Sequence, residues 1–407
     1  MSVALSREPG QRRASTVLAH FALRRLLEAV GRPPISFVLW DGEEVGEEGA
    51  AARVHLRDSG ALWRLVRNPS LGFGDMYADG RLEVEGDLAH TIELVFRASS
   101  QAPGPARYVL DRLGAPSRRN TPSRSRENVH HHYDLGNDFY ARWLDADLVY
   151  TCAYFEDPRV SLEEAQRAKL EHVCRKLRLR PGERVLEAGC GWGSLALYMA
   201  EHYGVTVQAF NVSSEQIRFA RLAAMRRGLR SRVEFVEDDY RSAQGHFDAF
   251  VSIGMLEHVG RAHYASLGRL IDARLGASGR GLLHFIGHAR PWRMNPWIER
   301  TIFPGAYIPA LSEMLPLIEE SGLVVADVEN LRRHYALTLE HWLARFEKQA
   351  SWVESRYDAR FVRTWRLYLA SAIASFRSGS CQLFQLLFER TGGTGLPWTR
   401  ADLYTGR

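Results

Sequence analysis

A glycine-rich loop holds the most informative chemistry of the sequence. The apolar run Val185 to Ala188 leads into Gly189-Cys190-Gly191-Trp192-Gly193, and a helical pattern begins near Ser194. Glycines permit a tight turn and a close approach of ligand to backbone, while a helix N-terminus favours electron-rich groups. Dinucleotides and S-adenosylmethionine are the two cofactor classes that use such a loop, and a glycine turn without a ligand is the structural alternative.

The glycine spacing favours S-adenosylmethionine. A dinucleotide fingerprint reads GxGxxG, whereas this loop reads GxGxG. A dinucleotide site also needs an acidic residue at the end of the second strand, but the run VTVQAF is followed by Asn211. The acidic pair Asp238-Asp239 comes after the third predicted strand, where a carboxylate suits an adenine amino group.

The elements that position this loop alternate between strand and helix patterns through residues 128–407. This alternation predicts a doubly wound, Rossmann-like α/β domain. From Thr338 to Glu389 the pattern is mostly helical. Its aromatic stripe is interpreted as core or, alternatively, as a surface that lines a channel for an apolar chain or meets lipid. The predicted strands are Arg184–Ala188, Thr206–Phe210, Val233–Val236, Phe247–Ile253 and Arg280–Ile286, and the stripe is Phe361, Trp365, Tyr368, Leu369, Ala372 and Phe376.

Residues 1–100 predict a small α+β domain. Its predicted elements are a helix over Ser15–Val30, strands over Ile35–Trp40, Ala52–Leu56 and Leu62–Val66, a helix, turn and extended segment within SLGFGDMYADGRLEVEGDL, and a short helix over Leu88–Phe96. Residues 101–127 contain four Pro and six Arg and predict a linker. This linker is either a solvated spacer or a basic segment drawn to anionic phospholipid.

Composition excludes several classes of protein. The chain has 407 residues, of which 45% are hydrophobic and 11% aromatic, which is too apolar for a disordered chain. Four Cys form no disulfide framework, and no run approaches the ~20 apolar residues that span a bilayer. Without a visible secretory signal, we expect a cytoplasmic protein or one that lies on a membrane.

The net charge of +5 comes almost wholly from arginine, because only three of the 53 cationic side chains are Lys. A GC-rich genome explains this bias, and so does phosphate recognition by guanidinium groups. The basic residues are not interleaved with aromatic residues in a recognisable nucleic-acid motif, so we expect no nucleic-acid partner.

Several ordered motifs carry a resemblance to a known family. They are HHHYDLGNDFYARWLD (130–145), VYTCAYF (149–155), AGCGWG (188–193), VSIGMLEHVG (251–260), LLHFIG (282–287), IFPGAYIP (302–309), RRHYALTLEHW (332–342) and SFRSGSCQLFQ (375–385). With them the chain resembles the cyclopropane-fatty-acyl-phospholipid synthase family, relatives of the mycolic-acid cyclopropane synthases. The first 100 residues resemble the small N-terminal domain of its longer, phospholipid-acting members.

The resemblance implies that residues 128–407 have the class I S-adenosylmethionine-dependent methyltransferase fold. It also implies transfer of a methyl cation from S-adenosylmethionine to the cis double bond of an unsaturated phospholipid acyl chain. A carbocation forms, and a bound bicarbonate removes a proton so that a cyclopropane ring closes. Cys152 and Ile286 would hold this bicarbonate through backbone groups, and Glu257, His284 and Tyr335 through side chains. Aromatic faces stabilise positive charge, and the candidates are Tyr154, Phe155, Phe303, Trp342 and Tyr335.

The resemblance also assigns cofactor contacts along the chain. Asn211 and Thr151 stand where the family more often has Thr and Ser, and Phe285 replaces a usual Thr between the two predicted bicarbonate residues of that motif. The implied cofactor-binding residues are Tyr150, Thr151, Gly189, Gly191, Asn211, Gln216, Asp239, Tyr240, Ile253 and Gly254.

Alternatives to this interpretation remain open. A nucleophilic role for Cys152 is not favoured, because no order of partner residues supports it and the family uses its backbone. A metal site at His130–His132 is not favoured, because adjacent histidines point in different directions. Relatives that end the carbocation differently make methyl-branched or methylene products, and a lipid-binding protein with an inactive catalytic domain is the non-enzymatic alternative. The resemblance further implies a peripheral position on the inner face of the cell membrane and suggests a homodimer.

Overall fold

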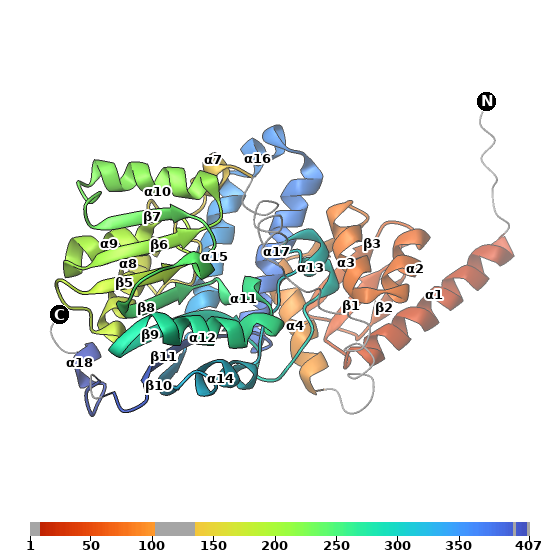
Figure 1. The fold of residues 1–407 in the computed structure, drawn as a ribbon. Coiled ribbons are helices and arrows are strands. Elements are labelled where there is room, and N and C mark those ends of the chain that lie inside the picture. Colours follow the sequence, from red (N-terminus) through yellow and green to blue (C-terminus); the bar gives the residue numbers. More distant parts are fainter. Residues whose placement is uncertain (1–8, 102–134, 394–395, 405–407) are drawn as a thin grey trace. The chain divides into compact units, whose positions relative to one another are not determined.

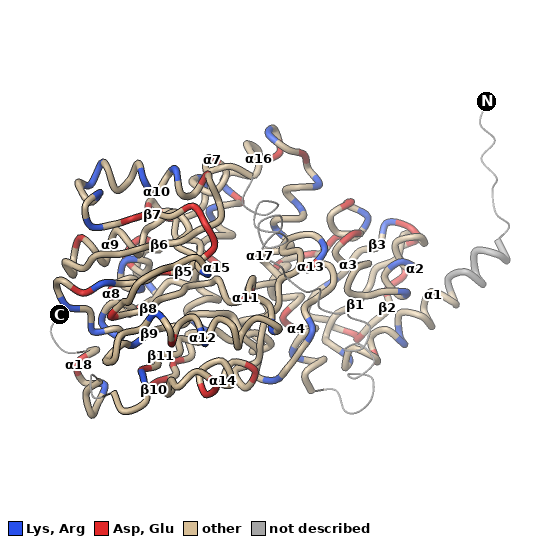
Figure 2. Tube along the Cα trace, viewed as in Figure 1, with Lys and Arg blue, Asp and Glu red and all other residues tan. Residues whose placement is uncertain are grey.

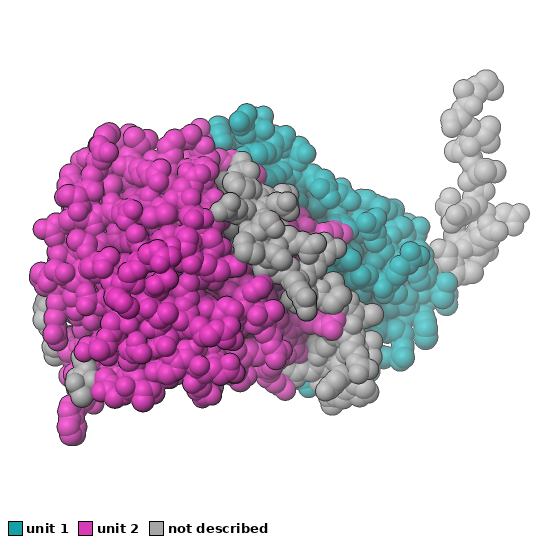
Figure 3. Space-filling model, in the orientation of Figure 1, with its two compact units in different colours: residues 1–114, 295–297, 350–378 teal, residues 115–294, 298–349, 379–407 magenta. Residues whose placement is uncertain are grey.

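The computed structural model of the chain describes residues 9–101, 135–393 and 396–404. Two compact units divide it, and Figure 3 colours them separately. Unit 1 comprises residues 1–114, 295–297 and 350–378, and unit 2 comprises residues 115–294, 298–349 and 379–407. Beyond its first residue, the predicted linker over residues 101–127 lies outside the described residues, as do the three histidines His130–His132.

Unit 1 is built on a four-stranded sheet in the order β2-β1-β3-β4. Strands β1 and β3 run parallel, while β2 and β4 pair antiparallel with β1 and β3. Its elements are α1 (Pro9–Ala29), β1 (Ile35–Val38), β2 (Glu44–Gly46), β3 (Ala52–Leu56), α2 (Ser59–Arg67), α3 (Pro69–Ala78), β4 (Leu82–Glu85), α4 (Leu88–Gln101), α16 (Ala350–Arg356) and α17 (Ala359–Ser378).

One predicted strand of unit 1 is wrong: residues Leu62–Val66 lie within helix α2. Asp58 caps this helix, because its side chain accepts a hydrogen bond from the Ala61 N–H at 3.0 Å. The buried residues Ala61, Leu62 and Leu65 share one helical face, so the apolar run follows helical rather than strand periodicity. The other predicted elements of this region are present.

Residues 350–378 were expected in the methyltransferase domain, but the structure groups them with unit 1. Helix α17 packs against α3 and α4. The Arg363 guanidinium lies 4.3 Å from the Tyr77 ring centroid and donates to the carbonyl oxygens of Tyr77 and Leu82. The interpretation of the aromatic stripe as core is confirmed, because Trp365, Tyr368, Leu369 and Phe376 are buried.

Unit 2 contains a seven-stranded sheet in the order β10-β11-β9-β8-β5-β6-β7, drawn in Figure 1. Strands β5 to β9 are mutually parallel, with β5 at the centre, where the chain switches from building one side of the sheet to the other. All five predicted strands are confirmed: β5 (Arg184–Ala188), β6 (Thr206–Asn211), β7 (Val233–Glu237), β8 (Phe247–Ile253) and β9 (Leu275–Gly287).

Two further strands complete the sheet: β10 (Leu323–Asn330) and β11 (Gln382–Arg390). Strand β11 lies at the end of the region, residues 338–389, that the sequence predicts to be mostly helical. The prediction is wrong for this last part of the region. Strand β11 is antiparallel to β9 and buried along most of its length. Its continuous apolar run therefore reflects burial on both faces, which hides strand periodicity.

Helices cover both faces of the sheet. On one face, Val185, Ala209 and Val251 pack with α8, α9 and α10; on the other, neighbouring residues such as Leu186 and Phe210 pack with α11, α12 and α14. The remaining elements of unit 2 are α7 (Asn137–Tyr140), α8 (Leu162–Leu177), α9 (Ser194–Tyr203), α10 (Ser214–Arg226), η1 (Tyr240–Ser242), α11 (Leu256–Val259), η2 (Arg261–His263), α12 (Tyr264–Arg274), α13 (Pro296–Thr301, which starts in unit 1), α14 (Leu311–Glu319), α15 (Arg332–Lys348) and α18 (Ala401–Tyr404).

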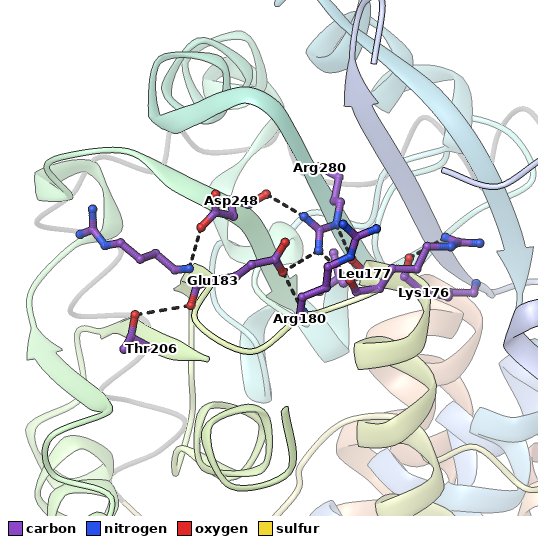
Figure 4. A network of polar contacts seen from close by, with 9 residues as sticks. Lys176, Leu177, Arg180, Glu183, Thr206, Asp248 and Arg280 are labelled. Atoms are coloured by element: carbon purple, nitrogen blue, oxygen red, sulfur yellow. Dashed lines mark hydrogen bonds and ion pairs between the residues drawn. The ribbon is translucent and has the colours of Figure 1, made fainter. Parts of the chain in front are cut away.

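The amino edge of the parallel strands is joined by the side chain of Arg280, shown in Figure 4. Its guanidinium donates to the carbonyl oxygens of Leu177, Arg178 and Asp248 and to Glu183 Oε2, the last at 2.7 Å. These contacts connect α8, β8 and the segment before β5 to strand β9. The hydrogen-bond donors of this buried guanidinium therefore stabilise the fold, at the edge of the sheet opposite the glycine loop.

Candidate active site

The predicted cofactor residues of β5 to β8 lie where these parallel strands end at one edge of the sheet (Figure 1). Gly189 and Gly191 follow β5, Asn211 ends β6, and Ile253 ends β8. In doubly wound sheets, ligands bind beside the carboxyl ends of the strands at the point where strand order reverses. Here that point lies between β5 and β8.

The glycine loop has a backbone that side chains would not permit. Gly189, Gly191 and Gly193 have φ values of +82°, +53° and +87°. A Cβ at Gly193 would lie 2.6 Å from the Phe235 ring, and one at Gly189 would lie 2.9 Å from Met255 Cβ. A Cβ at Gly191 would meet nothing within 4 Å, so this glycine faces open space in which a ligand could approach the backbone.

Polar side chains from β6, α10 and η1 continue this edge. Asn211 Nδ2 donates to Gly191 O at 3.2 Å and to Gln216 Oε1 at 2.7 Å, so it fixes both the loop and the glutamine. Asp239 Oδ1 accepts from the Arg241 N–H at 3.0 Å and caps η1, in which Tyr240 is buried. Figure 2 shows the acidic stretch that leads from the end of β7 into this turn.

The segment Val149–Phe155 is held from two helices. Gln166 of α8 donates to the Thr151 carbonyl at 2.8 Å, and Thr338 Oγ1 of α15 accepts from the Ala153 N–H at 3.0 Å. Thr151 is adjacent to Gly254, since a Cβ on that glycine would lie 3.1 Å from Thr151 Cγ2. The segment therefore brings Thr151 and Cys152 to the end of β8.

Cys152 is fully buried, and its Sγ donates to Ala153 O at 3.1 Å. Burial raises the pKa of its thiol far above the ordinary range, and the positive charge of Lys169 only partly offsets this. Because the thiolate is the reactive form, the side chain is unsuited to nucleophilic catalysis.

Glu257 lies on the short helix α11, directly after β8, and its carboxylate is buried. Oε1 accepts from the Ile286 N–H at 2.6 Å, while Oε2 has no partner among the described residues. Burial raises the pKa of Glu257 to about 7, and the hydrogen bond from Ile286 only partly counters it. The Ile286 backbone thus orients the glutamate and leaves one oxygen free to meet a ligand.

His284 is on β9, on the same face of the strand as Ile286. Its Nδ1 lies 3.1 Å from Gln385 Nε2, while its Nε2 is buried without a partner among the described residues. Because the Gln385 amide donates to Nδ1, the ring proton resides on Nε2. Burial lowers the pKa of His284 well below its usual value, and the positive charges of Lys169 and Lys176 lower it further. The ring is therefore neutral.

Tyr335 belongs to an aromatic wall. Its ring centroid lies 6.0 Å from that of Trp342, which lies 5.2 Å from Tyr150. By contrast, Tyr154 is stacked between two imidazoles, with its ring centroid 4.2 Å from that of His172 and 4.8 Å from that of His334. The faces of such rings can stabilise transient positive charge. The His284 N–H donor and the Glu257 oxygen without a described partner suit a small anion.

Three residues at this site were not singled out from the sequence: Lys169, Thr338 and Gln385. All three are buried. Thr338 and Gln385 are polar residues within apolar stretches, which is the signal that could have identified them, whereas Lys169 lies in a polar part of its helix and gives no such signal. In the described part of the chain, no group of three or more His, Cys, Asp or Glu side chains is arranged to hold a metal ion.

Two family models match the chain. Mycolic acid cyclopropane synthetase matches residues 120–386, and a domain of unknown function matches residues 22–103. The first match covers every predicted site residue.

Individual relatives agree with the family match. A probable fatty acid methyltransferase of Pseudomonas putida is 35% identical over 91% of this chain and 96% of its own length. The cyclopropane-fatty-acyl-phospholipid synthase of Escherichia coli K12 is 36% identical over 85% of this chain and 90% of its own. The crystal structure of mycolic acid cyclopropane synthase CmaA1 complexed with SAH and CTAB matches with a TM-score of 0.63 and 29% identity, covering 65% of this chain and 98% of that one.

Proposed function

Because the chain belongs to the mycolic acid cyclopropane synthetase family, we propose that it converts the cis double bond of an unsaturated phospholipid acyl chain into a cyclopropane ring. S-adenosylmethionine, held by the residues at the ends of β5 to β8, would supply the one-carbon unit as a sulfonium methyl group. The open space at Gly191 and the polar contacts of Asn211 and Gln216 fit such a cofactor.

The observation that carries the proposal is a pair of buried polar atoms, Glu257 Oε2 and His284 Nε2, that have no hydrogen-bond partner within residues 9–101, 135–393 and 396–404. A buried polar group without a hydrogen bond is costly, so a ligand that satisfies both atoms is expected. Bicarbonate fits, because His284 Nε2–H can donate to its oxygen and Glu257 can accept its hydrogen. When bound, bicarbonate would supply the base for ring closure.

The aromatic wall and the burial of the site have a second role. An alkene is a weak nucleophile, so it must be held close to the methyl donor in a site without water. Tyr335, Trp342 and Tyr150 present ring faces that stabilise developing positive charge and exclude water.

A membrane partner is supported by helix α1 of unit 1. Val17, Leu18 and Phe21 are 70%, 54% and 63% exposed, and Arg24 and Arg25 continue the same helical face. Apolar side chains beside cations suit the interface of an anionic bilayer. No helix among the described residues has the length and hydropathy to cross a membrane, so we propose peripheral contact, at the inner face of the cell membrane.

Fatty acid methyltransferases among the relatives favour a second candidate product, a methyl-branched or methylene acyl chain. Retention of Glu257, His284 and Tyr335 supports ring closure instead, because these groups fit the base that the ring requires.

The decisive experiment incubates the protein with S-adenosylmethionine, bicarbonate and vesicles of cis-unsaturated phosphatidylglycerol and phosphatidylethanolamine. Mass and fragmentation analysis of the fatty acids should show one added CH₂ per double bond in a ring. A methylene or methyl-branched product would overturn the cyclopropane assignment, and binding of S-adenosylmethionine without turnover would indicate an inactive lipid-binding protein.

A further inference from the structure

Helix α8 buries two lysines, Lys169 and Lys176, which are 2% and 1% exposed. They are seven residues apart and therefore share one helical face. The Lys176 ammonium lies 2.6 Å from Glu329 Oε2 and 3.7 Å from Asp327 Oδ2, so its charge is neutralised locally. Lys169 differs, because no ion pair within 4.0 Å involves it among the described residues.

The hydrogen bond that Lys169 makes is to a neutral hydroxyl: Nζ donates to Thr151 Oγ1 at 3.0 Å. An ammonium buried without a carboxylate in direct contact is costly, so the position of Lys169 calls for a functional explanation. Gln166 of the same helix donates to the Thr151 carbonyl at 2.8 Å. Helix α8 therefore holds Thr151 by its side chain and by its backbone.

The direction of the Lys169 hydrogen bond determines what Thr151 can do. An ammonium only donates, so Thr151 Oγ1 accepts from it and the hydroxyl proton remains available for another acceptor. A neighbouring cation also polarises the hydroxyl and strengthens it as a donor. Thr151 lies next to Gly254 and precedes Cys152, and the Gly254 N–H donates to His284 O at 2.8 Å.

We propose that Lys169 is a positioning residue that fixes the Thr151 hydroxyl as a donor to a carboxylate-type anion in the active site. This inference rests on the proposed function, which provides two such anions: the carboxylate of S-adenosylmethionine and bicarbonate. The buried positive charge additionally makes the site attractive to either anion.

The groups that face Lys169 leave its charge in place near neutral pH. They are Asp145 from the segment between α7 and α8, Glu187 of β5, Cys152 of the held segment, and Cys174 of α8 itself. Burial lowers the pKa of Lys169 to about 8, and these groups raise it again in part. Burial raises the pKa of Glu187 to about 8, so this carboxyl is largely uncharged at pH 7.

The test compares Lys169→Met with Lys176→Met as a matched control and Lys169→Arg as the conservative variant. Calorimetry at pH 7 gives the Kd of S-adenosylhomocysteine, and steady-state rates give KM for S-adenosylmethionine and the bicarbonate dependence. We expect Lys169→Met to weaken the binding of one of the two anions about 10- to 100-fold. Lys169→Arg should restore part of the lost affinity, and Lys176→Met should change the affinity for neither anion. If only the affinity for S-adenosylhomocysteine falls, the anion is the cofactor carboxylate. If only the dependence of the rate on bicarbonate changes, the anion is bicarbonate.

Two further measurements separate positioning from general structural damage. Thr151→Val should produce the same loss, and the double variant Lys169→Met/Thr151→Val should lose no more than Thr151→Val alone. The advantage of wild type over Lys169→Met should also fade as pH rises through about 8. Additive losses, or unchanged affinity for both anions in Lys169→Met, would overturn the inference. Because calorimetry requires no turnover, failure of the proposed reaction would leave this test readable if the anion is the cofactor carboxylate.

Discussion

Strand β9 carries two buried polar residues, Arg280 and His284, in opposite circumstances. The Arg280 side chain is engaged by three carbonyl oxygens and by Glu183 at the amino edge of the sheet. His284, four residues further, lies at the carboxyl edge. One of its ring nitrogens is bonded to Gln385, and the other has no partner in the part of the chain that the structure describes. Burial is similar, so the difference lies in hydrogen bonding, which separates a structural polar residue from one that awaits a ligand.

The same contrast extends to the neighbours of each residue. At the amino edge, the Arg184 N–H donates to Asp248 Oδ2 at 2.8 Å, and the Arg180 N–H donates to Glu183 Oε2 at 2.9 Å. At the carboxyl edge, one buried oxygen of Glu257 has no hydrogen-bond partner among the residues that the structure describes. Each such atom costs roughly 1–3 kcal/mol of stability in the free protein, which a bound ligand would restore. The polar groups at the amino edge therefore stabilise the fold, whereas those at the carboxyl edge lower the stability of the free protein and are available to bind a ligand.

The largest effect should come from Glu257→Gln at the carboxyl edge. The amide can still accept the Ile286 N–H, but it cannot accept a proton from the ligand, so the rate of product formation should fall about 10²- to 10⁴-fold. Measured turnover on phospholipid vesicles gives the rate, and the Kd of S-adenosylhomocysteine should stay unchanged as a control. Full activity in this variant would remove Glu257 from the catalytic site.

At the amino edge, Arg280→Met should act on stability instead. The substitution leaves three carbonyl oxygens and the Glu183 carboxylate without their donor, which should lower the free energy of unfolding by about 3 kcal/mol. Urea denaturation measures this loss, and activity per folded molecule should be within about twofold of wild type. If the variant loses turnover but keeps normal stability, the conclusion that the amino edge serves stability and the carboxyl edge serves activity is wrong.

The pH dependence of stability sharpens the comparison further. The pKa of Glu257 is raised from 4.5 to about 7 by burial, so between these values the folded chain binds more protons than the unfolded chain. Stability must then fall as pH rises through this window, by about 3 kcal/mol for this group. Denaturation of wild type and Glu257→Gln at pH 4.5 and pH 7 isolates the group, because other titrations cancel in the difference. A difference that does not change with pH would show that Glu257 is hydrated in the folded protein.

The sequence predicts the parallel part of unit 2 well, because its strands are short apolar runs separated by helices and glycine turns. It fails where burial on both faces removes periodicity, as in β11, and where a short amphipathic helix imitates a strand, as in α2. The membership of α17 in unit 1 is set by contacts between residues almost 300 positions apart, such as Arg363 with Tyr77, which no local pattern reveals.

For the site, residue types and motifs single out Glu257, His284 and Gly191 as candidates, but they do not predict the hydrogen bonds of these residues. Ile286 orients Glu257 because α11 lies beside β9. Gln385 fixes the tautomer of His284 because of the register of β9 with β11. Lys169 was missed because a lysine on a helix is usually exposed, and only the tertiary structure shows it buried against Thr151.

The smallest effect is expected for Cys152→Ala, at a residue that lies at the carboxyl edge but has a satisfied side chain. Its Sγ already donates to Ala153 O, and burial keeps the thiol protonated, so removal of the sulfur should cost about 1 kcal/mol of stability and leave turnover within about threefold. Thiol-reagent labelling should likewise modify the partly exposed Cys381 well before Cys152. A loss of turnover beyond about 100-fold would show that the sulfur itself takes part in the reaction. Unpartnered atoms would then not be a sufficient guide to the functional residues of this edge, and a satisfied side chain would have to be counted among them.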